Sequence, residues 1–586
     1  MTGPVPEFSN SQIAAALEEL GDLYELDGAI IHRVVAYRNA AKAVREASTS
    51  VAGLARVGRA TELPGIGATL QEKIQALVDT GQIPAAEKLR AKFPPGLVAI
   101  TRLAGLGPKR ARMLYDELGI DSLDALRAAI ESERVRDLRG FGVKAEENIR
   151  AALEAAAAGD GGEVRVVLDR ALAIGEPIVA ALRADPAADR VELAGSARRW
   201  TDSVKDLDVI ATAHDPAALA AAFAELGTFE RVHSSGPAGA RATTHSGLRV
   251  DLRIVAPEQF GNLLQHFTGS KQHNMALRDM AVRKGLHVSE YGVLDDATGE
   301  TRTCATEADV YALLGLAYIE PELREDRGEL EVAADGGAGL PRLLEPGELR
   351  GDLHCHTIAS DGRTTIEKMA LAARERGLEY LAITDHSATM GFGNDVAPDE
   401  LRRQIERVRE ANAAIEGIEL LAGSEVNVLP DGRLDYDDEL LAQLDWVIAS
   451  VHTSFRMPAA EMTARIVAAL EHPLVDALGH PTGRKVERRP PYAVDMEEVI
   501  AAAARTGTML EINANPDRRD LDDVHARAAA AAGVPIVIDT DAHWPANFDV
   551  ARYGVATARR AWLGPEQVAN TRPWPELRAL RKRARR

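Results

Sequence analysis

The sequence predicts a multidomain protein that combines α+β and α/β architecture, and three observations lead to this fold class. A chain of 586 residues exceeds the size at which one hydrophobic core stops growing, so we expect about three or four domains. Residues 11–156 read as short amphipathic helices separated by glycine turns, and strands mix with helices from residue 163. From residue 349, short apolar runs alternate with Ala-rich helices, which favours a parallel α/β sheet or barrel.

The composition is that of a globular protein, with 46% hydrophobic and 27% charged residues. No apolar run approaches the roughly 18 residues that cross a bilayer, and the N-terminus lacks a secretory signal pattern. The two cysteines, Cys304 and Cys355, cannot form a disulfide framework and fit a reducing compartment. We therefore expect a soluble cytoplasmic monomer with no membrane contact.

The net charge of -20 argues at first against nucleic-acid binding, which basic surface and counterion release drive. Residues 1–158, however, hold about 20 Lys and Arg against about 21 Asp and Glu side chains. Nearly all of the excess negative charge therefore lies later in the chain, and part of it is what metal sites would need.

Three glycine turns in the helical region resemble one another: LPGIG at 63–67, LAGLG at 103–107 and LRGFG at 138–142. Glycines in a tight helix-hairpin-helix permit positive φ and bring bare N–H groups to the surface at a helix N-terminus, which suits phosphate. One such turn can simply join two helices, but three at a spacing of roughly 35–40 residues favour DNA-backbone binding. The expected DNA-binding residues are Gly65, Gly67, Gly105, Gly107, Gly140 and Gly142.

The next region has strand candidates at 191–196, 206–212 and 248–255, with Gly195 and Ser196 at a strand-to-helix turn. In DLDVIAT the period of 2 places both carboxylates of the Asp-x-Asp pair on one face of a strand.

The Asp-x-Asp pair is Asp206 and Asp208, and Asp251 on another strand could complete a cluster of three. Three carboxylates repel one another unless hard divalent cations such as Mg²⁺ or Mn²⁺ fill the space between them. Two such ions would activate a 3'-hydroxyl and stabilise a leaving pyrophosphate, so this cluster indicates nucleotidyl transfer.

The Gly-Ser turn, the paired arginines at 198 and 199, the aspartates and HFTGSKQHN at 266–274 together resemble family X DNA polymerases, the group that contains DNA polymerase beta. The resemblance implies a nucleotidyltransferase palm in which Asp206 and Asp208 hold both metals, while Asp251 holds the catalytic one and takes the primer-hydroxyl proton. It further implies nucleotide-binding residues, deoxynucleoside triphosphates as substrates and gapped or nicked DNA as the partner. These nucleotide-binding residues are Gly195, Ser196 and Arg199 at the triphosphate, Gly269 in the Phe-Thr-Gly-Ser turn, Asn274 at the minor-groove edge and Arg278 at the template strand.

The segment LPGIGATLQEKI also resembles the helix-hairpin-helix of the small lyase domain in that family. Lys73 then falls on the lysine that forms a Schiff base with the sugar at an abasic site, and Lys42 and His32 are candidates to assist it. The resemblance implies deoxyribose-phosphate lyase activity, and a solvated surface lysine is the alternative.

Four positions depart from the eukaryotic branch of the family. Trp200 replaces a glycine after the paired arginines, Val204 and Lys205 replace a Ser-Gly pair, and His266 stands where Tyr is common. The departure at His266 leaves ribonucleotide rejection open. Trp200 and Lys205 support an alternative in which the N-terminal half is a DNA-binding module with a weakened polymerase site, which the intact aspartates oppose.

In the C-terminal region, His, Asp and Glu residues follow short apolar runs, and in α/β barrels the chemistry lies at such strand ends. The motifs are GDLHCHTIASDG at 351–362, ITDH at 383–386, GSEVN at 423–427, SVH at 450–452, GHP at 479–481, EINANP at 511–516 and DTDAH at 539–543. Mixed imidazole and carboxylate donors suit Zn²⁺, Mn²⁺ or Fe²⁺ better than Ca²⁺.

This pattern resembles the PHP (polymerase and histidinol phosphatase) family, which implies a distorted (β/α)7 barrel with up to three divalent ions. The implied ligands are His354, His356, Asp361, His386, Glu425, His452, His480, Asp541 and His543. Glu425 would bridge two ions. Cys355 points to the opposite face by alternation, and Arg484 is a candidate phosphate or DNA contact.

The two resemblances together describe the bacterial form of family X, and they predict the domain order along the chain. We expect a lyase-like helix-hairpin-helix domain at 1–90, a second helix-hairpin-helix subdomain at 91–158, a palm at 159–258, a nucleotide-selection subdomain at 259–325, an acidic Gly-rich linker at 326–348, a PHP domain at 349–575 and a basic tail at 576–586. The predicted function is gap-filling DNA repair, including base excision repair, with a 3'-5' exonuclease that leaves AP endonuclease or 3'-phosphatase activity open. A phosphatase for a small metabolite is the alternative for the C-terminal half.

Overall fold

A computed structural model describes residues 8–47, 49–103, 105–157, 165–334, 336–389 and 395–585. The chain forms two compact units. The first comprises 1–165, 173–192 and 205–254, and the second comprises 166–172, 193–204 and 255–586. Each unit is described by itself.

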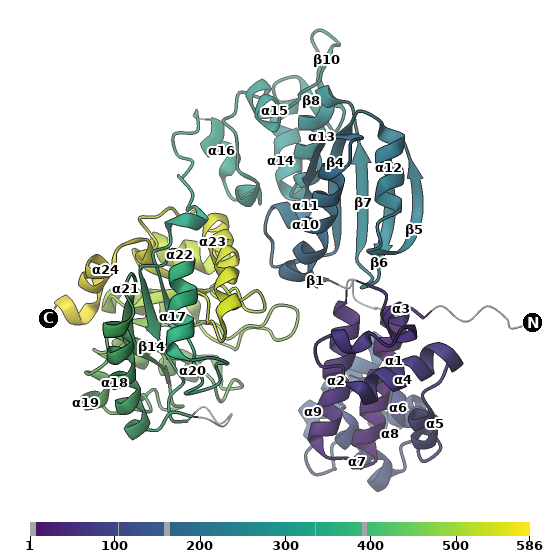
Figure 1. Cartoon of the computed structure of the whole chain (residues 1–586), viewed down its shortest axis with the longest axis vertical. Helices are drawn as coiled ribbons and strands as arrows, with labels where there is room; N and C mark the ends of the chain where they lie inside the picture. Colours follow the sequence, from purple (N-terminus) through teal and green to yellow (C-terminus); the bar gives the residue numbers. More distant parts are fainter. Residues whose placement is uncertain are drawn as a thin grey trace, which may run out of the picture. The chain divides into compact units, whose positions relative to one another are not determined.

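The N-terminal region of the first unit is helical, as the sequence predicts (Figure 1). Its helices are α1 (Asn10–Leu26), α2 (Ile31–Glu46), α3 (Val51–Arg56), α4 (Ala68–Thr80), α5 (Pro84–Arg90), α6 (Pro95–Thr101), α7 (Pro108–Leu118), α8 (Leu123–Glu131) and α9 (Gly142–Ala157). The apolar faces of these short helices meet in one core that runs from Ile13 to Leu153. Ser9 begins α1 with a capping box, in which Gln12 is the partner residue.

The rest of the first unit is a five-stranded sheet in the order β2-β4-β7-β6-β5. Its strands are β2 (Ala188–Leu193), β4 (Asp206–Ala213), β5 (Phe229–Gly236), β6 (Gly239–Thr244) and β7 (Arg249–Ile254), with helix α12 (Pro216–Ala224) between β4 and β5. Strands β4 and β7 are parallel, and β6 is antiparallel to both β7 and β5. The strands predicted at 206–212 and 248–255 are confirmed, and so is the turn from strand to helix at Gly195, where α11 (Gly195–Arg198) begins.

The second unit begins with two short pieces of chain. Strand β1 (Val166–Val167) pairs with β3 (Ser203–Val204), and helix α10 (Leu168–Ala184) starts directly after β1. The segment expected as the nucleotide-selection subdomain follows, with helices α13 (Phe260–Thr268), α14 (Lys271–Val282) and α15 (Glu307–Leu313) and a small antiparallel sheet of β8 (Leu286–Ser289), β9 (Gly292–Asp295) and β10 (Thr301–Arg302).

The segment expected as a linker, 326–348, differs from that expectation in the part that the structure describes; Asp335 lies outside it. Helix α16 (Glu329–Ala334) and a 3-10 turn, η4 (Pro346–Glu348), form there, and Leu330 and Leu343 join the core that α14 and α15 form. Polar contacts also hold this segment in place. The buried Glu329 accepts a hydrogen bond from the ring of His273 at 2.7 Å and from the N–H of Arg327 at 2.7 Å.

The C-terminal domain is a nearly closed barrel of seven parallel strands in sequential order, so the predicted (β/α)7 architecture is confirmed. The strands are β11 (Gly351–Cys355), β12 (Tyr380–Ile383), β13 (Glu419–Asn427), β14 (Trp446–Ser450), β15 (Ala477–Leu478), β16 (Met509–Asn513) and β17 (Ile536–Asp539). The connecting helices are α17 (Ile366–Glu375), α18 (Pro398–Ala414), α19 (Asp438–Leu441), α20 (Ala459–Glu471), α21 (Met496–Thr506), α22 (Asp523–Ala531) and α23 (Ala551–Arg560). The N–H of His356 donates to the carbonyl oxygen of Ala542 at 2.8 Å and joins the first strand to the segment after the last one.

Alternation along the strands divides the barrel core in two. Ile383 and Val447 join the layer between strands and helices, and so does Cys355, as the predicted alternation requires. Tyr380 and Trp446, each the first residue of its strand, instead contact a cluster that includes helix α24 (Trp574–Leu580). Helix α24 therefore covers the end of the barrel where the strands begin.

The basic tail packs on the barrel instead of fraying. After α24 a 3-10 turn, η7 (Lys582–Arg585), forms, and Arg583 makes an ion pair with the buried Asp476. Lys582 Nζ donates to the carbonyl oxygen of Leu470 at 2.8 Å. Burial of a carboxylate is costly unless a cation pairs with it, so Asp476 gives the tail a fixed position.

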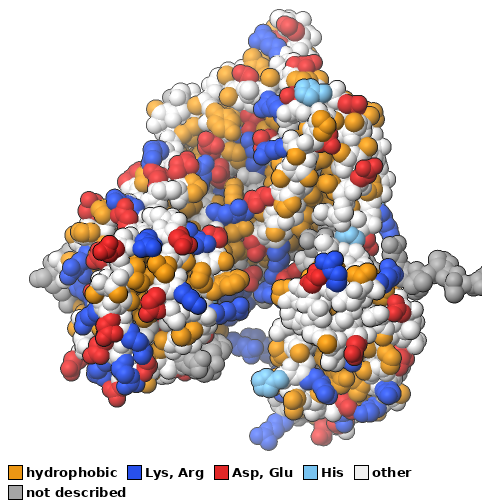
Figure 2. All heavy atoms as spheres, viewed as in Figure 1, with side chains coloured by type: hydrophobic (Ala, Val, Ile, Leu, Met, Phe, Trp, Pro, Cys, Tyr) orange, Lys and Arg blue, Asp and Glu red, His pale blue; other side chains and the backbone are white. Residues whose placement is uncertain are grey.

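Basic and acidic side chains are intermingled over α18 and α19 on the face that Figure 2 shows. Ion pairs such as Arg403 with Glu400 at 2.6 Å account for part of this pattern. In the part of the chain that the structure describes, no helix has both the length and the apolar character that a bilayer crossing requires.

We predict that Trp574→Ala lowers the melting temperature of the barrel, because Trp574 is 5% exposed and fills the core under the strands. Truncation of a buried Trp costs about 3–5 kcal/mol. Calorimetry of the full chain measures the effect, and Trp544→Ala, at a position 45% exposed, is the matched control. Equal melting temperatures for the two variants would contradict the assignment of α24 as a core element.

Candidate active sites

Three palm carboxylates lie on the neighbouring parallel strands β4 and β7, where Asp208 is in register with Asp251. Asp206 and Asp208 alternate with the buried Leu207 and Val209, so both carboxylates face the same side of the sheet, as the period of 2 predicts. Burial, with repulsion from Asp206 and Asp251, raises the pKa of Asp208 to about 7.

Arginines face the two outer carboxylates. Arg249 Nη2 lies 3.3 Å from Asp206 Oδ2, and Arg241 Nε lies 3.7 Å from Asp251 Oδ1. Among the described residues, groups of three ligand atoms within 4.8 Å of one another occur in the C-terminal domain, and the palm aspartates do not approach one another that closely. The like charges of the aspartates favour this separation.

The predicted nucleotide-binding residues belong to the second unit. Gly195 and Ser196 begin α11 at the start of the palm turn, which we define as residues 195–204, and Gly195 has the positive φ of 65° that favours glycine. Arg199 donates from Nη1 to the carbonyl oxygen of Thr268 at 2.5 Å and from Nε to Glu325 at 3.1 Å. The structure therefore brings Arg199 next to the Phe-Thr-Gly-Ser turn.

The Phe-Thr-Gly-Ser turn ends α13 and begins α14. Gly269 has φ 68°, and the hydroxyl of Ser270 accepts the N–H of His273 at 3.2 Å as the N-cap. Asn274 donates to the carbonyl oxygen of His266 at 2.7 Å, and Arg278 Nη2 lies 3.2 Å from the ring of His266. The ring of His266, in place of the common Tyr, thus contacts Arg278, and its backbone carbonyl holds Asn274.

The nine predicted PHP ligands converge at the end of the barrel where the strands finish. They form three groups of close donors: His356, Asp361, His386 and His543; His354, His356 and Asp541; and His386, Glu425 and His452. His480 joins through its Nε2, which lies 2.9 Å from Glu425 Oε1. Glu425 is central, because His386 and His452 approach its two oxygens at 2.7 and 3.1 Å.

Buried ligand atoms without hydrogen bonds indicate that the donor set fits divalent cations. Several of its buried ligand atoms make no hydrogen bond, and these atoms are His354 Nε2, His356 Nδ1 and Nε2, His386 Nδ1, Glu425 Oε2, His452 Nδ1 and His480 Nδ1. Buried polar atoms in proteins almost always have a hydrogen-bond partner. A group of buried atoms that face one another without such partners therefore indicates a bound ligand. Imidazole nitrogens mixed with carboxylates suit Zn²⁺, Mn²⁺ or Fe²⁺.

The charges within the cluster shift the pKa values of its histidines in opposite directions. Burial opposes the charged form of His386, but the carboxylates of Glu425 and Asp361 raise its pKa to about 10. Burial lowers the pKa of His356 to about 4, helped by repulsion from His386 and His543. The histidines keep the pKa of Glu425 well below its usual range in spite of burial. The lowered pKa favours the charged form of Glu425, as cation binding requires.

Sequence reasoning missed the residues that orient these ligands. Glu511 is buried, accepts from His354 Nδ1 at 2.6 Å and accepts the N–H of His480 at 2.6 Å. Asn513, two residues further on the same strand, donates to Asp541 Oδ2 at 3.2 Å. The signal was present in EINANP, because alternation places both side chains on one face.

The guanidinium of Arg484 contacts other residues of the protein. Its Nη1 pairs with Asp202 at 2.9 Å, and its Nε donates to the carbonyl oxygen of Arg518 at 3.0 Å. The guanidinium is thus used within the protein, and the phosphate or DNA contact of Arg484 stays a prediction.

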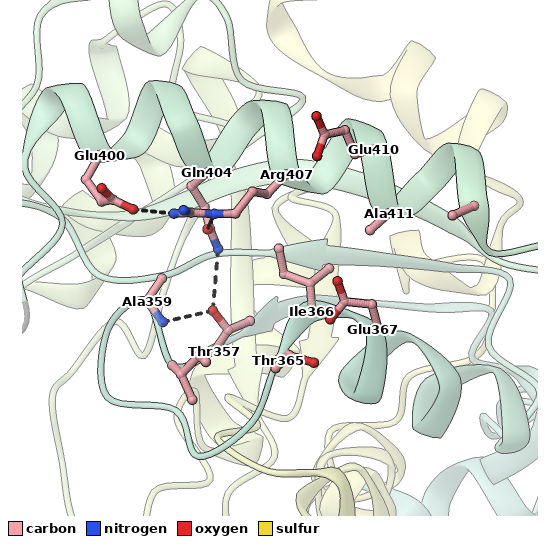
Figure 3. A pocket seen from close by; sticks show the side chains of 12 residues that line it. Thr357, Ala359, Thr365, Ile366, Glu367, Glu400, Gln404, Arg407, Glu410 and Ala411 are labelled. Atoms are coloured by element: carbon pink, nitrogen blue, oxygen red, sulfur yellow. Dashed lines mark hydrogen bonds and ion pairs between the residues drawn. The ribbon is translucent and has the colours of Figure 1, made fainter.

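A surface pocket of about 640 Å³ lies between the loop after β11 and helix α18, away from the nine ligands (Figure 3). Gln404 forms its wall with Thr357, and both donate to the carboxylate of Asp385, at 2.8 and 2.7 Å. Asp385, beside His386 in ITDH, is thus saturated by hydrogen bonds and braces the loop instead of offering a free ligand atom.

The three glycine turns share one backbone feature. Gly65, Gly105 and Gly140 all have positive φ, between 83° and 93°. Gly67 and Gly107 have ordinary φ and are the N-caps of α4 and α7; Gly142, φ 62°, is the first residue of α9. Open space surrounds all six α-carbons. Ala104 of the second turn lies outside the described residues.

Lys73 lies half-buried on α4, while Lys42 and His32 are exposed on α2.

Family models match most of the chain. A helix-hairpin-helix domain matches residues 8–83, a SAM-like helix-hairpin-helix tandem matches 98–155, the DNA polymerase beta thumb matches 263–325 and the PHP domain matches 352–515.

Among curated proteins, the chain is 38% identical to the DNA polymerase/3'-5' exonuclease PolX of Bacillus subtilis, over 97% of this chain and 99% of that protein. Its C-terminal part is 33% identical to a probable phosphatase of Thermoanaerobacter sp., over 38% of this chain and 89% of the phosphatase. A probable phosphatase of Caldanaerobacter subterraneus is also 33% identical, over 35% of this chain and 80% of its own length. With the aspartate-bearing palm sheet, the thumb and the donor-lined barrel, this similarity along nearly the whole length shows that the chain belongs to the family X DNA polymerases with a C-terminal PHP domain.

Proposed function

We propose that this chain fills short gaps in DNA by template-directed nucleotidyl transfer and removes nucleotides from 3' ends with its PHP domain. The observation that carries the proposal is the presence of two separate donor groups, one on β4 and β7 and one at the strand ends of the barrel. The name of the Bacillus subtilis relative, DNA polymerase/3'-5' exonuclease, supports the same pair of activities.

In the palm, Asp206, Asp208 and Asp251 would hold Mg²⁺ or Mn²⁺, which supply charge neutralisation at the triphosphate and at the primer hydroxyl. Asp251 is 32% exposed and in register with Asp208, so it can hold a proton from the primer 3'-hydroxyl. Ser196 and Arg199, with Gly195 and Gly269, would contact the triphosphate. Asn274 and Arg278 would contact the nascent base pair and the template.

In the barrel, the nine donors would hold up to three ions of Zn²⁺, Mn²⁺ or Fe²⁺, which supply an activated water and neutralise the phosphodiester. Glu425 would be a ligand shared between two ions, and the approach of His386 and His452 to its two oxygens supports this role. Glu511 fixes the ring of His354 through Nδ1, which leaves Nε2 as the ligand atom.

The helix-hairpin-helix turns would bind the backbone of gapped or nicked DNA through their exposed N–H groups. Lys73 is our candidate for the nucleophile of a deoxyribose-phosphate lyase, supported by its half-buried place on α4 after the first turn. We keep AP endonuclease and 3'-phosphatase as further outcomes for the PHP site, and a monomer as the working state.

One observation favours a second candidate for the barrel. The probable phosphatases that it resembles match the PHP region alone, so a small phosphate ester is an alternative substrate. Hydrolysis of p-nitrophenyl phosphate at rates far above those on DNA 3' ends would favour this candidate.

The two activities should separate by mutation. Asp206→Ala with Asp208→Ala should reduce primer extension on gapped DNA by at least about 10³-fold, because the ions lose their ligands, and should leave exonuclease activity unchanged. His354→Ala with His356→Ala should do the reverse. Both are measured on one labelled gapped duplex with Mn²⁺ present. Primer extension that survives in the aspartate variant would sink the polymerase assignment.

Asp208→Asn should stabilise the metal-free protein while it abolishes extension. Because the folded pKa of Asp208 is raised to about 7, its charge destabilises the fold, and this penalty grows as the pH rises from about 4 to 7. In EDTA at pH 8 we expect the variant to melt about 2–4 °C higher, as about 1 kcal/mol would give. At pH 5 the difference should shrink, and excess Mg²⁺ should raise the melting temperature of the parent more than that of the variant. A parent that melts at the higher temperature in EDTA at pH 8 would contradict the charge repulsion.

Gly67→Ala with Gly107→Ala should weaken DNA binding without loss of stability. Both glycines have ordinary φ and open space around the α-carbon, so alanine fits the fold but stands between the N–H groups and a phosphate. We expect the Kd for gapped DNA to rise about fivefold, as loss of about 1 kcal/mol implies. Gly227→Ala, also with open space, is the control. Equal affinities for both proteins would show that these turns do not touch DNA.

A further inference from the structure

We propose that two arginines of the PHP domain, Arg519 and Arg560, are positioning residues that hold the palm turn in the shape that binds nucleotide. The inference rests on the proposed polymerase function and adds to it a dependence of one domain on the other. Both arginines and the palm turn belong to the second compact unit.

The two arginines hold consecutive carbonyl groups of the palm turn. Arg560 Nη1 donates to the carbonyl oxygen of Arg199 at 2.8 Å, and Arg519 Nη1 donates to that of Trp200 at 2.8 Å. Arg519 is 1% exposed and Arg560 is 8% exposed. A buried guanidinium is costly unless acceptors surround it, so these two contacts are built features of the packing.

Trp200 explains why the palm turn needs support. It has φ 56°, a left-handed conformation that is a rare and strained one for a bulky residue. The sequence has Trp at the position where the eukaryotic branch often has glycine, which adopts such a φ without cost. In this chain the carbonyl group is held by Arg519, and the indole ring packs against Tyr553, with 5.8 Å between ring centroids. The PHP domain thus supplies contacts that offset the strain.

The side chain of Arg199 depends on the same network. Its Nε donates to Glu325 Oε1 at 3.1 Å, and Arg560 Nη1 donates to the same oxygen at 2.8 Å. Arg560 also pairs with Asp523 at 2.9 Å. Arg560 therefore fixes both the backbone of Arg199 and the carboxylate that orients its guanidinium.

A third contact ties the palm turn to a loop near the PHP ligands. Asp202 pairs with Arg484 at 2.9 Å and with Arg519 at 3.2 Å, and Arg484 also donates to the carbonyl oxygen of Arg519. The neighbouring Arg518 places its Nε 3.6 Å from Asp541. Adjacent residues of one loop thus face the palm turn and the metal cluster.

The test is steady-state kinetics of Arg519→Ala and Arg560→Ala in the full chain. We expect KM for deoxynucleoside triphosphate to rise about tenfold, the loss of one charge-assisted hydrogen bond, with kcat within about threefold of the parent. Exonuclease activity on the same samples reports the fold of the PHP domain. Arg559→Ala is the matched control, because Arg559 lies in the same helix but pairs with Glu322 at 2.8 Å and not with the palm turn. We expect its KM to match that of the parent.

A double-mutant cycle separates positioning from general damage. Glycine at position 200 accepts a positive φ unaided, so in a Trp200→Gly background Arg519→Ala should raise KM less than threefold. An equal rise in both backgrounds, or an unchanged KM in Arg519→Ala and Arg560→Ala, overturns the proposal. If either single variant fails to fold, the Trp200→Gly pair and the remaining single variant decide by the same criterion. Failure of the parent itself to extend primers would instead overturn the proposed function.

Discussion

Both candidate sites bring together ionisable donors whose charges the protein offsets only in part with its own hydrogen bonds. In the palm, burial and two neighbouring carboxylates raise the pKa of Asp208 to about 7. In the barrel, buried atoms of His354 and Glu425 lack hydrogen bonds while they face one another. Such arrangements cost stability in the absence of cations and recover it when cations bind, so metal affinity and fold stability are linked in both domains. The rest of each domain keeps these donors in place against their own repulsion.

The donors of the two sites differ in how deeply they are buried. The barrel ligands lie at the ends of strands whose first residues, such as Tyr380 and Trp446, are locked by α24 from the opposite end. The orienting Glu511 is fully buried. The palm aspartates lie on a sheet face where Asp206 is 42% exposed and Arg249 approaches it. An open face of this kind can admit a primer and a triphosphate together. In the barrel, exposure is greatest at the rim ligands Asp361 and His543, which are 45% and 30% exposed.

Much of this could be predicted from the sequence, because the signals are local. A period of 2 places Asp206 beside Asp208, and the repeated pattern of apolar run and donor predicts the barrel and its nine converging side chains. The contacts that the sequence could not predict join residues far apart in the chain. The pairing of Asp476 with Arg583, which docks the tail, and the burial of Glu329 in the expected linker depend on tertiary packing, and no local pattern encodes them.

Trp200 illustrates the same limit and its physical meaning. As a sequence feature it is a departure that weakens the match to the eukaryotic polymerases. In the structure it is a bulky residue at φ 56° whose carbonyl group accepts a hydrogen bond from Arg519, 319 residues away. A glycine at that position would hold the turn by its own conformational freedom, and a tryptophan needs a partner surface. In this chain the contacts that offset the strain at Trp200 come from the PHP domain.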